Sequence, residues 1–142
     1  MGPLIRVLYV DDDPDLRAMA ELALAAVGGL AVTLCADGSQ AVALACSSDA
    51  QLVLLDVVMP GLDGPATLAA LRADPATAAL PVLFVTALDG DDDRARLLAL
   101  GAAGIIAKPL DLMGLAGQVK AAWMGLSLTP TYDHGIMPTG NG

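Results

Sequence analysis

Four short apolar runs in this chain each end on a polar residue that is able to take part in phosphoryl chemistry. Each run has the length of a β-strand, and in an open parallel α/β sheet the groups just beyond the carboxyl ends of the strands meet in one crevice. If the runs are parallel strands, three carboxylates, a hydroxyl and an ammonium share a pocket suited to a divalent metal ion and a phosphoryl group. These polar residues are Asp11, Asp12, Asp56, Thr86 and Lys108.

Strand-like and helix-like segments alternate five times along the chain. The strand-like segments are mostly continuous apolar runs, typical of strands covered on both faces. The helix-like segments have the apolar spacing of helices with one buried face. This order predicts a three-layer α/β fold, in which helices cover both faces of a five-stranded parallel sheet. The predicted strands cover residues 5–10, 31–36, 52–55, 82–85 and 104–107, and the predicted helices 14–27, 39–47, 65–73, 89–100 and 110–124.

The charge balance argues against direct binding of nucleic acid. The chain carries a formal net charge of −9, and such a chain is repelled by nucleic acids and by anionic membrane surfaces. Charged residues, Pro and Gly interrupt every apolar stretch before it could span a bilayer, and the N-terminal segment lacks the apolar core of a secretory signal. We therefore expect a cytoplasmic protein without membrane contact, in which Cys35 and Cys46 are reduced thiols.

The carboxylates after the first run exceed what helix capping requires. Asp13 is sufficient as an N-cap, because Pro14 follows it at the first helical position. Asp11 and Asp12 add like-charge repulsion, which a cation between them would relieve. Because the ligands are hard oxygens without Cys or His close by, the set favours Mg²⁺ over zinc or copper.

Asp56 follows a run that should be buried, where a carboxylate is costly unless it is paired or bound to a metal. A structural explanation for Asp56 is that its carboxylate accepts hydrogen bonds from loop amides. The functional explanation is that it is a nucleophile that forms an aspartyl phosphate. Mg²⁺ and the ammonium of Lys108 would neutralise the charge, and the hydroxyl of Thr86 could bond a phosphoryl oxygen. The Lys108–Pro109 bond also permits a cis peptide, which would direct the ammonium inward.

These motifs, taken together, resemble the receiver domain of bacterial two-component response regulators. The matching segments are residues 9–14 (YVDDDP), 54–64 (LLDVVMPGLDG), 85–87 (VTA) and 107–109 (AKP), and the resemblance covers residues 4–124. It implies a flavodoxin-like fold with strand order 2-1-3-4-5. It also implies that Asp56 accepts phosphate from a histidine kinase or a histidine phosphotransfer protein. Mg²⁺ would be bound by Asp12, Asp56 and the backbone carbonyl of Val58, with Asp11 acting mainly through water.

The chain departs from the family pattern at three positions. Ile105 stands where family members usually carry a Tyr or Phe that moves inward on phosphorylation, so the usual aromatic switch is not expected here. Val58 and Leu88 occupy the two positions that tune hydrolysis of the aspartyl phosphate in the family. Because neither side chain can orient a water molecule by a hydrogen bond, we expect slow loss of phosphate.

The predicted organisation is a receiver domain over residues 4–124 and a flexible tail over 125–142, which contains His134, the single histidine and a residue without an expected role. We expect a switch, not a classical enzyme, which phosphorylates itself from a phosphodonor and slowly dephosphorylates. It would alter the binding of an output protein or pass phosphate on in a relay. The fourth helix, fifth strand and fifth helix would form the output face of a monomer or a weak homodimer.

Three other classes compete with this interpretation. A haloacid dehalogenase-type phosphohydrolase would need a second Asp two residues after the nucleophile, and that residue is Val58. A nucleotide- or flavin-binding domain would need a glycine-rich phosphate loop, and neither G-x-G-x-x-G nor G-x-x-x-x-G-K-[ST] occurs. A receiver-like module that binds its partner independently of phosphate remains the alternative, against which the complete set of Asp, Thr and Lys residues argues.

Overall fold

The computed structural model describes residues 2–87 and 91–128. Its five strands are all parallel and form one sheet in the order β2-β1-β3-β4-β5, so the predicted fold class and strand order are confirmed. The strands are β1 (Arg6–Val10), β2 (Ala31–Cys35), β3 (Leu52–Asp56), β4 (Val82–Thr86) and β5 (Gly104–Ala107).

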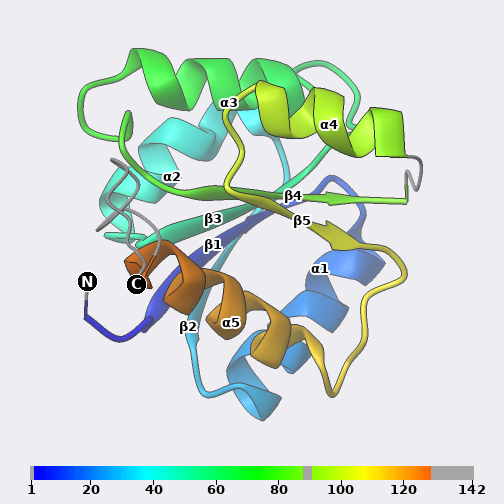
Figure 1. Ribbon diagram of the computed structural model, residues 1–142. Helices are drawn as coiled ribbons and strands as arrows, with labels where there is room; N and C mark the ends of the chain where they lie inside the picture. The colour runs from blue at the N-terminus through cyan, green and yellow to red at the C-terminus, as the bar shows by residue number, and fades with distance from the viewer. Residues whose placement is uncertain (1, 88–90, 129–142) are drawn as a thin grey trace, which may run out of the picture.

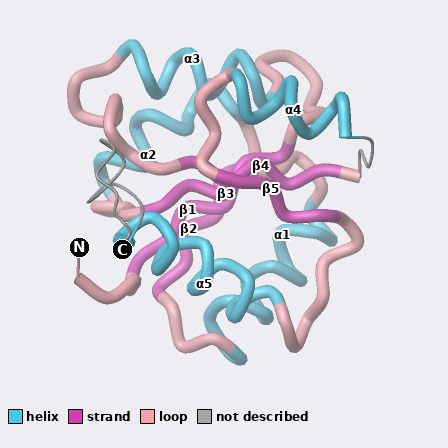
Figure 2. The backbone as a smooth tube through the Cα atoms, viewed as in Figure 1, coloured by secondary structure: helices cyan, strands magenta, loops and turns pink. Residues whose placement is uncertain are grey.

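Helices cover both faces of the sheet, which lies as the middle of three layers (Figures 1 and 2). One face packs against α1 and α5, and the other against α2, α3 and α4. The helices are α1 (Pro14–Glu21) with its π-helical continuation η1 (Leu22–Val27), the 3₁₀ turn η2 (Gly38–Gln40), α2 (Ala41–Ser47), α3 (Gly64–Ala73), α4 (Asp91–Ala99) and α5 (Leu115–Leu128).

The apolar runs form central strands because both of their faces are covered. Successive side chains of a strand point to opposite faces, and in β1 Val7 and Tyr9 join the core under α1 and α5, whereas Leu8 and Val10 join the core under α2 to α4. All five residues of β3 are buried. In β3 the one polar side chain is Asp56, at the carboxyl end of the strand.

The first and the last helix differ most from the sequence prediction. The first helix ends at Val27 as expected, but its last six residues form wider π-helical turns. The last helix was predicted over 110–124 and this is wrong at both ends, since α5 runs from Leu115 to Leu128. Its start is delayed because Asp111 forms a turn, in which its carboxylate accepts the Met113 N–H and its carbonyl accepts the Gly114 N–H.

The helical extension carries α5 past Gly125, where the predicted tail begins. Residues 129–142, and with them His134, lie outside the described part of the chain, so the tail remains a prediction. Within residues 2–87 and 91–128, none of the helices combines the length and apolarity that crossing a bilayer requires.

Candidate functional site

Three carboxylates converge at the carboxyl ends of β1 and β3. Asp11 and Asp56 are buried, with 0% and 3% of their surface exposed, whereas Asp12 is exposed to solvent. One carboxylate oxygen from each of the three lies within 4.8 Å of the others. Parallel pairing of β1 with β3 produces this approach, because Val10 lies beside Leu55 and the next residue of each strand is the aspartate.

Lys108 supplies the positive charge at the centre of this group. Its Nζ donates to Asp56 Oδ1 at 2.9 Å and lies 3.8 Å from Asp11 Oδ2. The Lys108 side chain is 20% exposed and that of Asp56 4%, so solvent screens this ion pair only weakly. The Lys108–Pro109 peptide bond is cis, the isomer that the sequence permits.

The loop between β1 and α1 is ordered by its own aspartates. The carboxylate of Asp13 accepts the N–H groups of Asp15 and Leu16, which confirms Asp13 as the N-cap of α1. Asp11 Oδ1 accepts the Asp13 N–H at 3.0 Å. A guanidinium nitrogen of Arg17 donates to the Asp11 carbonyl at 2.9 Å. Asp12 is thus left at the surface as the carboxylate most accessible to an incoming ion.

The loop between β3 and α3 holds Asp56 from the other side. The Gly64 N–H donates to the Val57 carbonyl at 2.9 Å. A Cβ on Gly64 would lie 2.6 Å from the Asp56 carbonyl oxygen and 2.7 Å from the Val57 Cα, so only glycine permits this close approach. Val58, two residues after Asp56, is 73% exposed, so this loop carries an apolar residue at the surface.

Thr86 is buried at the end of β4, the strand next to β3. Its carbonyl accepts the Lys108 N–H at 2.8 Å, which ties the end of β4 to the residue after β5. Asp11, Asp12, Asp56 and Lys108 are therefore brought into direct proximity, while Thr86 lies at the same edge of the sheet. Ile105 is half-buried in β5, and Leu88 lies outside the described residues.

Burial dominates the protonation of Asp56. Loss of solvent raises the pKa of this carboxyl above its ordinary value of 3.8; the hydrogen bond from Lys108 opposes the rise, and the negative charge of Asp11 adds to it. The ionised carboxylate is consequently held in an unfavourable environment that a further cation would relieve. A carboxyl whose pKa is perturbed by burial and by neighbouring charges is typical of functional sites.

Tyr9 is a residue of the site that the sequence analysis missed. Its hydroxyl donates to Asp11 Oδ2 at 2.9 Å, and both residues are fully buried. Burial, and next the charge of Asp11, raise the pKa of the Tyr9 hydroxyl, so the group remains a donor. The signal was present in the sequence, because residues two apart in a strand share a face, and Tyr9 precedes Asp11 by two.

The donor set fits a hard divalent cation. Three carboxylates supply only oxygen ligands, one of them from the exposed Asp12, and no thiol or imidazole joins them among the described residues. Such sets suit Mg²⁺, which prefers one or two carboxylates with water and phosphate oxygens as its remaining ligands. Asp11, Asp12, Asp56 and the carbonyl of Val58 remain the predicted metal-binding residues.

Comparison with known proteins agrees with this geometry. Residues 7–120 match the family described as response regulator receiver domain. Response regulator PleD of Caulobacter vibrioides is 38% identical over 116 residues, which is 82% of this chain and 25% of PleD. Transcriptional regulatory protein PrrA of Mycobacterium tuberculosis is 38% identical over 135 residues, 95% of this chain and 57% of PrrA. The chain thus spans between a quarter and somewhat more than half of these relatives.

Solved structures show the same fold. Chemotaxis protein CheY4 of Vibrio cholerae superposes with a TM-score of 0.76 at 28% identity, covering 84% of this chain and 98% of CheY4. A response regulator from Chloroflexus aurantiacus superposes with a TM-score of 0.75 at 30% identity, covering 87% of this chain and 99% of the other. Residues 7–120, which match the receiver domain family, contain Asp11, Asp12 and Asp56.

The raised pKa of Asp56 predicts that the Asp56→Asn variant is more stable than the wild type in metal-free buffer. A carboxyl whose pKa is raised by folding loses stability as the pH rises above its ordinary pKa, because the folded chain binds the proton more tightly. Asparagine avoids this loss, and we expect a gain of about 1 kcal/mol at pH 7. The gain should shrink below the ordinary Asp pKa of 3.8.

Urea unfolding in EDTA across this pH range measures the effect. Asp74→Asn, which removes an aspartate from the turn after α3, controls for the loss of one negative charge. An Asp56→Asn variant that is less stable than the wild type at pH 7 would contradict the charge balance described for the site.

Proposed function

Because the chain belongs to the response regulator receiver domain family, we propose that it is a phosphoacceptor switch of a two-component signalling system, with Asp56 as the phosphoacceptor. The observation that supports this most is the partly buried contact between Lys108 Nζ and Asp56 Oδ1, at 2.9 Å, beside two further carboxylates. A carboxylate held beside one ammonium and two further carboxylates that could bind a metal ion is arranged to attack a phosphoryl group.

The proposed reaction needs little covalent work from the protein. A carboxylate oxygen of Asp56 forms a bond to phosphorus as the bond from phosphorus to the donor breaks, and the donor departs with the bonding electrons. The donor is a phosphohistidine of a histidine kinase or of a phosphotransfer protein, and its imidazole takes up a proton on leaving. Bound Mg²⁺ would supply charge neutralisation for the phosphoryl oxygens.

The remaining residues act on the product. Lys108, released when the Asp56 oxygen is phosphorylated, can donate to a phosphoryl oxygen, and so can the hydroxyl of Thr86. Movement of Thr86 would change the packing around β4 and β5, where Ile105 is half-buried. An isoleucine moves less apolar area than an aromatic ring, so we propose a weaker coupling between phosphorylation and the surface than an aromatic switch gives.

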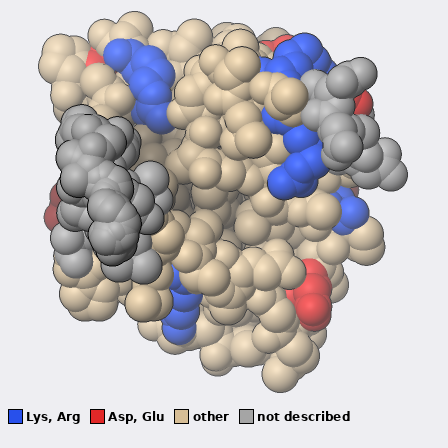
Figure 3. Space-filling view, in the orientation of Figure 1, with Lys and Arg blue, Asp and Glu red and all other residues tan. Residues whose placement is uncertain are grey.

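The output surface is proposed to be the face formed by α4, β5 and α5. Figure 3 shows that this face is mostly uncharged, with Lys and Arg side chains in separate places on it. Large apolar side chains are exposed in or beside these elements, and they are Leu98, Leu100, Met113 and Met124. Such a surface suits another protein or a second copy of the chain, while the net charge of −9 disfavours direct contact with nucleic acid.

Incubation of the chain with acetyl phosphate and Mg²⁺ is expected to add one phosphoryl group, detected by intact mass. The addition should be absent from the Asp56→Ala variant and from wild-type chain in EDTA. Equal uptake by the variant would place the phosphoryl group elsewhere. No uptake by any sample would favour the phosphate-independent module, and partner binding unaffected by Asp56→Ala would then support that alternative.

Val58 is apolar, 73% exposed and two residues after Asp56, and it bears on the lifetime of the proposed aspartyl phosphate. We expect the double variant Val58→Asn, Leu88→Glu to lose phosphate several times faster than the wild type, because its polar groups can orient an attacking water. Decay of the phosphorylated mass after removal of the donor measures this. Replacing Val58 with Ile is the matched apolar control. A double variant that decays no faster than the wild type would refute the slow-hydrolysis explanation.

A further inference from the structure

We infer that Tyr9 is a positioning residue of the acidic site, whose hydroxyl holds the carboxylate of Asp11 in place and thereby sets the affinity of the site for Mg²⁺. The inference rests on the proposed function, since it concerns the same metal ion. It gives a role to a side chain of β1 (Arg6–Val10), in addition to the acidic, hydroxyl and lysine side chains already assigned to the site.

The hydrogen bonds of Asp11 assign its two oxygens to different partners. Oδ1 accepts the backbone N–H of Asp13 at 3.0 Å, and Oδ2 accepts the Tyr9 hydroxyl at 2.9 Å. The Lys108 ammonium lies farther from Oδ2, at 3.8 Å, because it bonds Asp56 at 2.9 Å. Tyr9 therefore provides the closer of these two contacts to Oδ2, and Lys108 is left to serve Asp56.

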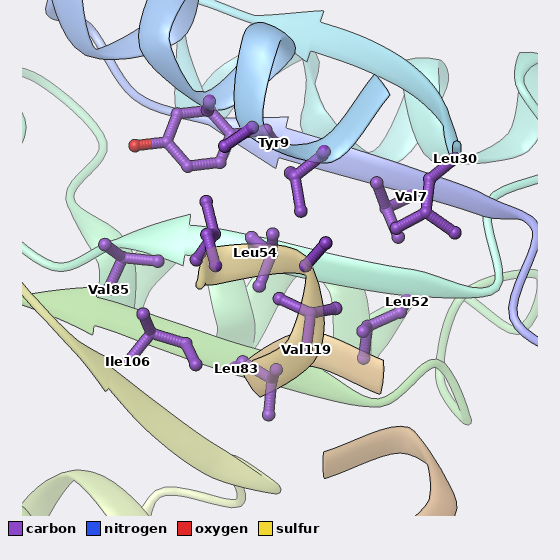
Figure 4. Packing of buried hydrophobic residues seen from close by; sticks show 14 of the residues in the cluster. Val7, Tyr9, Leu30, Leu52, Leu54, Leu83, Val85, Ile106 and Val119 are labelled. Atoms are coloured by element: carbon purple, nitrogen blue, oxygen red, sulfur yellow. The ribbon is translucent and has the colours of Figure 1, made fainter. Parts of the chain in front are cut away.

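The ring of Tyr9 is fixed by the core. It is fully buried and belongs to the apolar cluster that contains Leu54, Val85 and Ile106. Figure 4 shows the ring among these side chains with its hydroxyl oxygen directed the same way as the strand arrows, toward the carboxyl ends of the sheet. A donor carried on a central strand and clamped by packing holds its position far better than one on a loop.

Packing alone does not account for the hydroxyl. A phenylalanine would fill the same volume, and the other residues of β1 in the core, Val7, Leu8 and Val10, are aliphatic. A buried hydroxyl costs free energy unless it is hydrogen-bonded, and here the hydroxyl donates to the Asp11 carboxylate. The bond is charge-assisted, a class roughly twice as strong as neutral hydrogen bonds.

Loss of this hydroxyl would alter the charges that a metal ion meets. Asp11 Oδ2 would be left in the core without its donor, and the nearest cation is Lys108, already shared with Asp56. The ammonium would be drawn toward Asp11, and the Asp11 carboxylate would keep the hydrogen bond from the Asp13 N–H but lose the one that fixes Oδ2. Partners that orient the groups around a metal are typically worth about 10- to 100-fold in metal affinity.

The test is the Mg²⁺ affinity of Tyr9→Phe, measured by isothermal titration calorimetry on the full chain without a phosphodonor. We expect binding about 10-fold weaker than in the wild type. Thr77→Val is the matched control, because it also removes a buried hydroxyl, one that donates to the Leu71 carbonyl at 2.7 Å in the turn after α3. Thr77→Val should bind Mg²⁺ like the wild type even if it unfolds more easily.

The outcomes separate this inference from the proposed function. If the wild type binds Mg²⁺ and Tyr9→Phe binds it equally well or more tightly, the role of Tyr9 is overturned and the proposed function stands. Wild-type chain that does not bind Mg²⁺ overturns both. A second measurement avoids any substitution in the core. The wild-type chain is labelled with ¹³C at the tyrosine Cζ carbon, and the NMR resonance of Tyr9 is assigned by comparison with the Tyr132→Phe variant. Addition of Mg²⁺ should shift this Tyr9 resonance. A Tyr9 resonance unmoved at saturating Mg²⁺ would also overturn the inference.

Discussion

The ammonium of Lys108 lies between two buried carboxylates, 2.9 Å from Asp56 and 3.8 Å from Asp11, and the arrangement of the site depends on this shared charge. One positive charge does not balance the acidic groups, since Asp12 stands beside them. The site is therefore short of positive charge, and burial keeps the pKa of Asp56 raised. The proposed binding of a divalent cation and the proposed transfer of a phosphoryl group both follow from that imbalance.

The rest of the fold offsets the free-energy cost of these buried charges and holds them in fixed positions. The buried strands place their apolar side chains in two cores, one under α1 and α5 and one under α2 to α4. These cores fix the carboxyl ends of β1 and β3, from which Asp11 and Asp56 extend. The loops are held by short local contacts, among them the Asp13 cap and the close approach of Gly64 to the Asp56 carbonyl. Stability and reactivity thus reside in different parts of one sheet.

Much of this could be predicted from the sequence, for physical reasons. Apolar runs covered on both faces read as central parallel strands, and polar residues at their ends had to meet, so the fold and the proximity of Asp11, Asp12, Asp56 and Lys108 followed. The delayed start of α5 could not be read from periodicity, because it depends on the turn formed by Asp111. Tyr9 was not assigned to the site because an aromatic residue in a strand is usually a core residue. Only the structure shows that its hydroxyl donates to the Asp11 carboxylate.

The central claim is that the phosphoryl group is carried by Asp56. Borohydride reduces an aspartyl phosphate to homoserine, so peptide mass spectrometry of chain treated with phosphodonor, Mg²⁺ and then borohydride identifies the residue directly. The account predicts homoserine at position 56 and at no other aspartate. Homoserine at position 11 or 12, or phosphate retained on a hydroxyl or imidazole side chain, would contradict it.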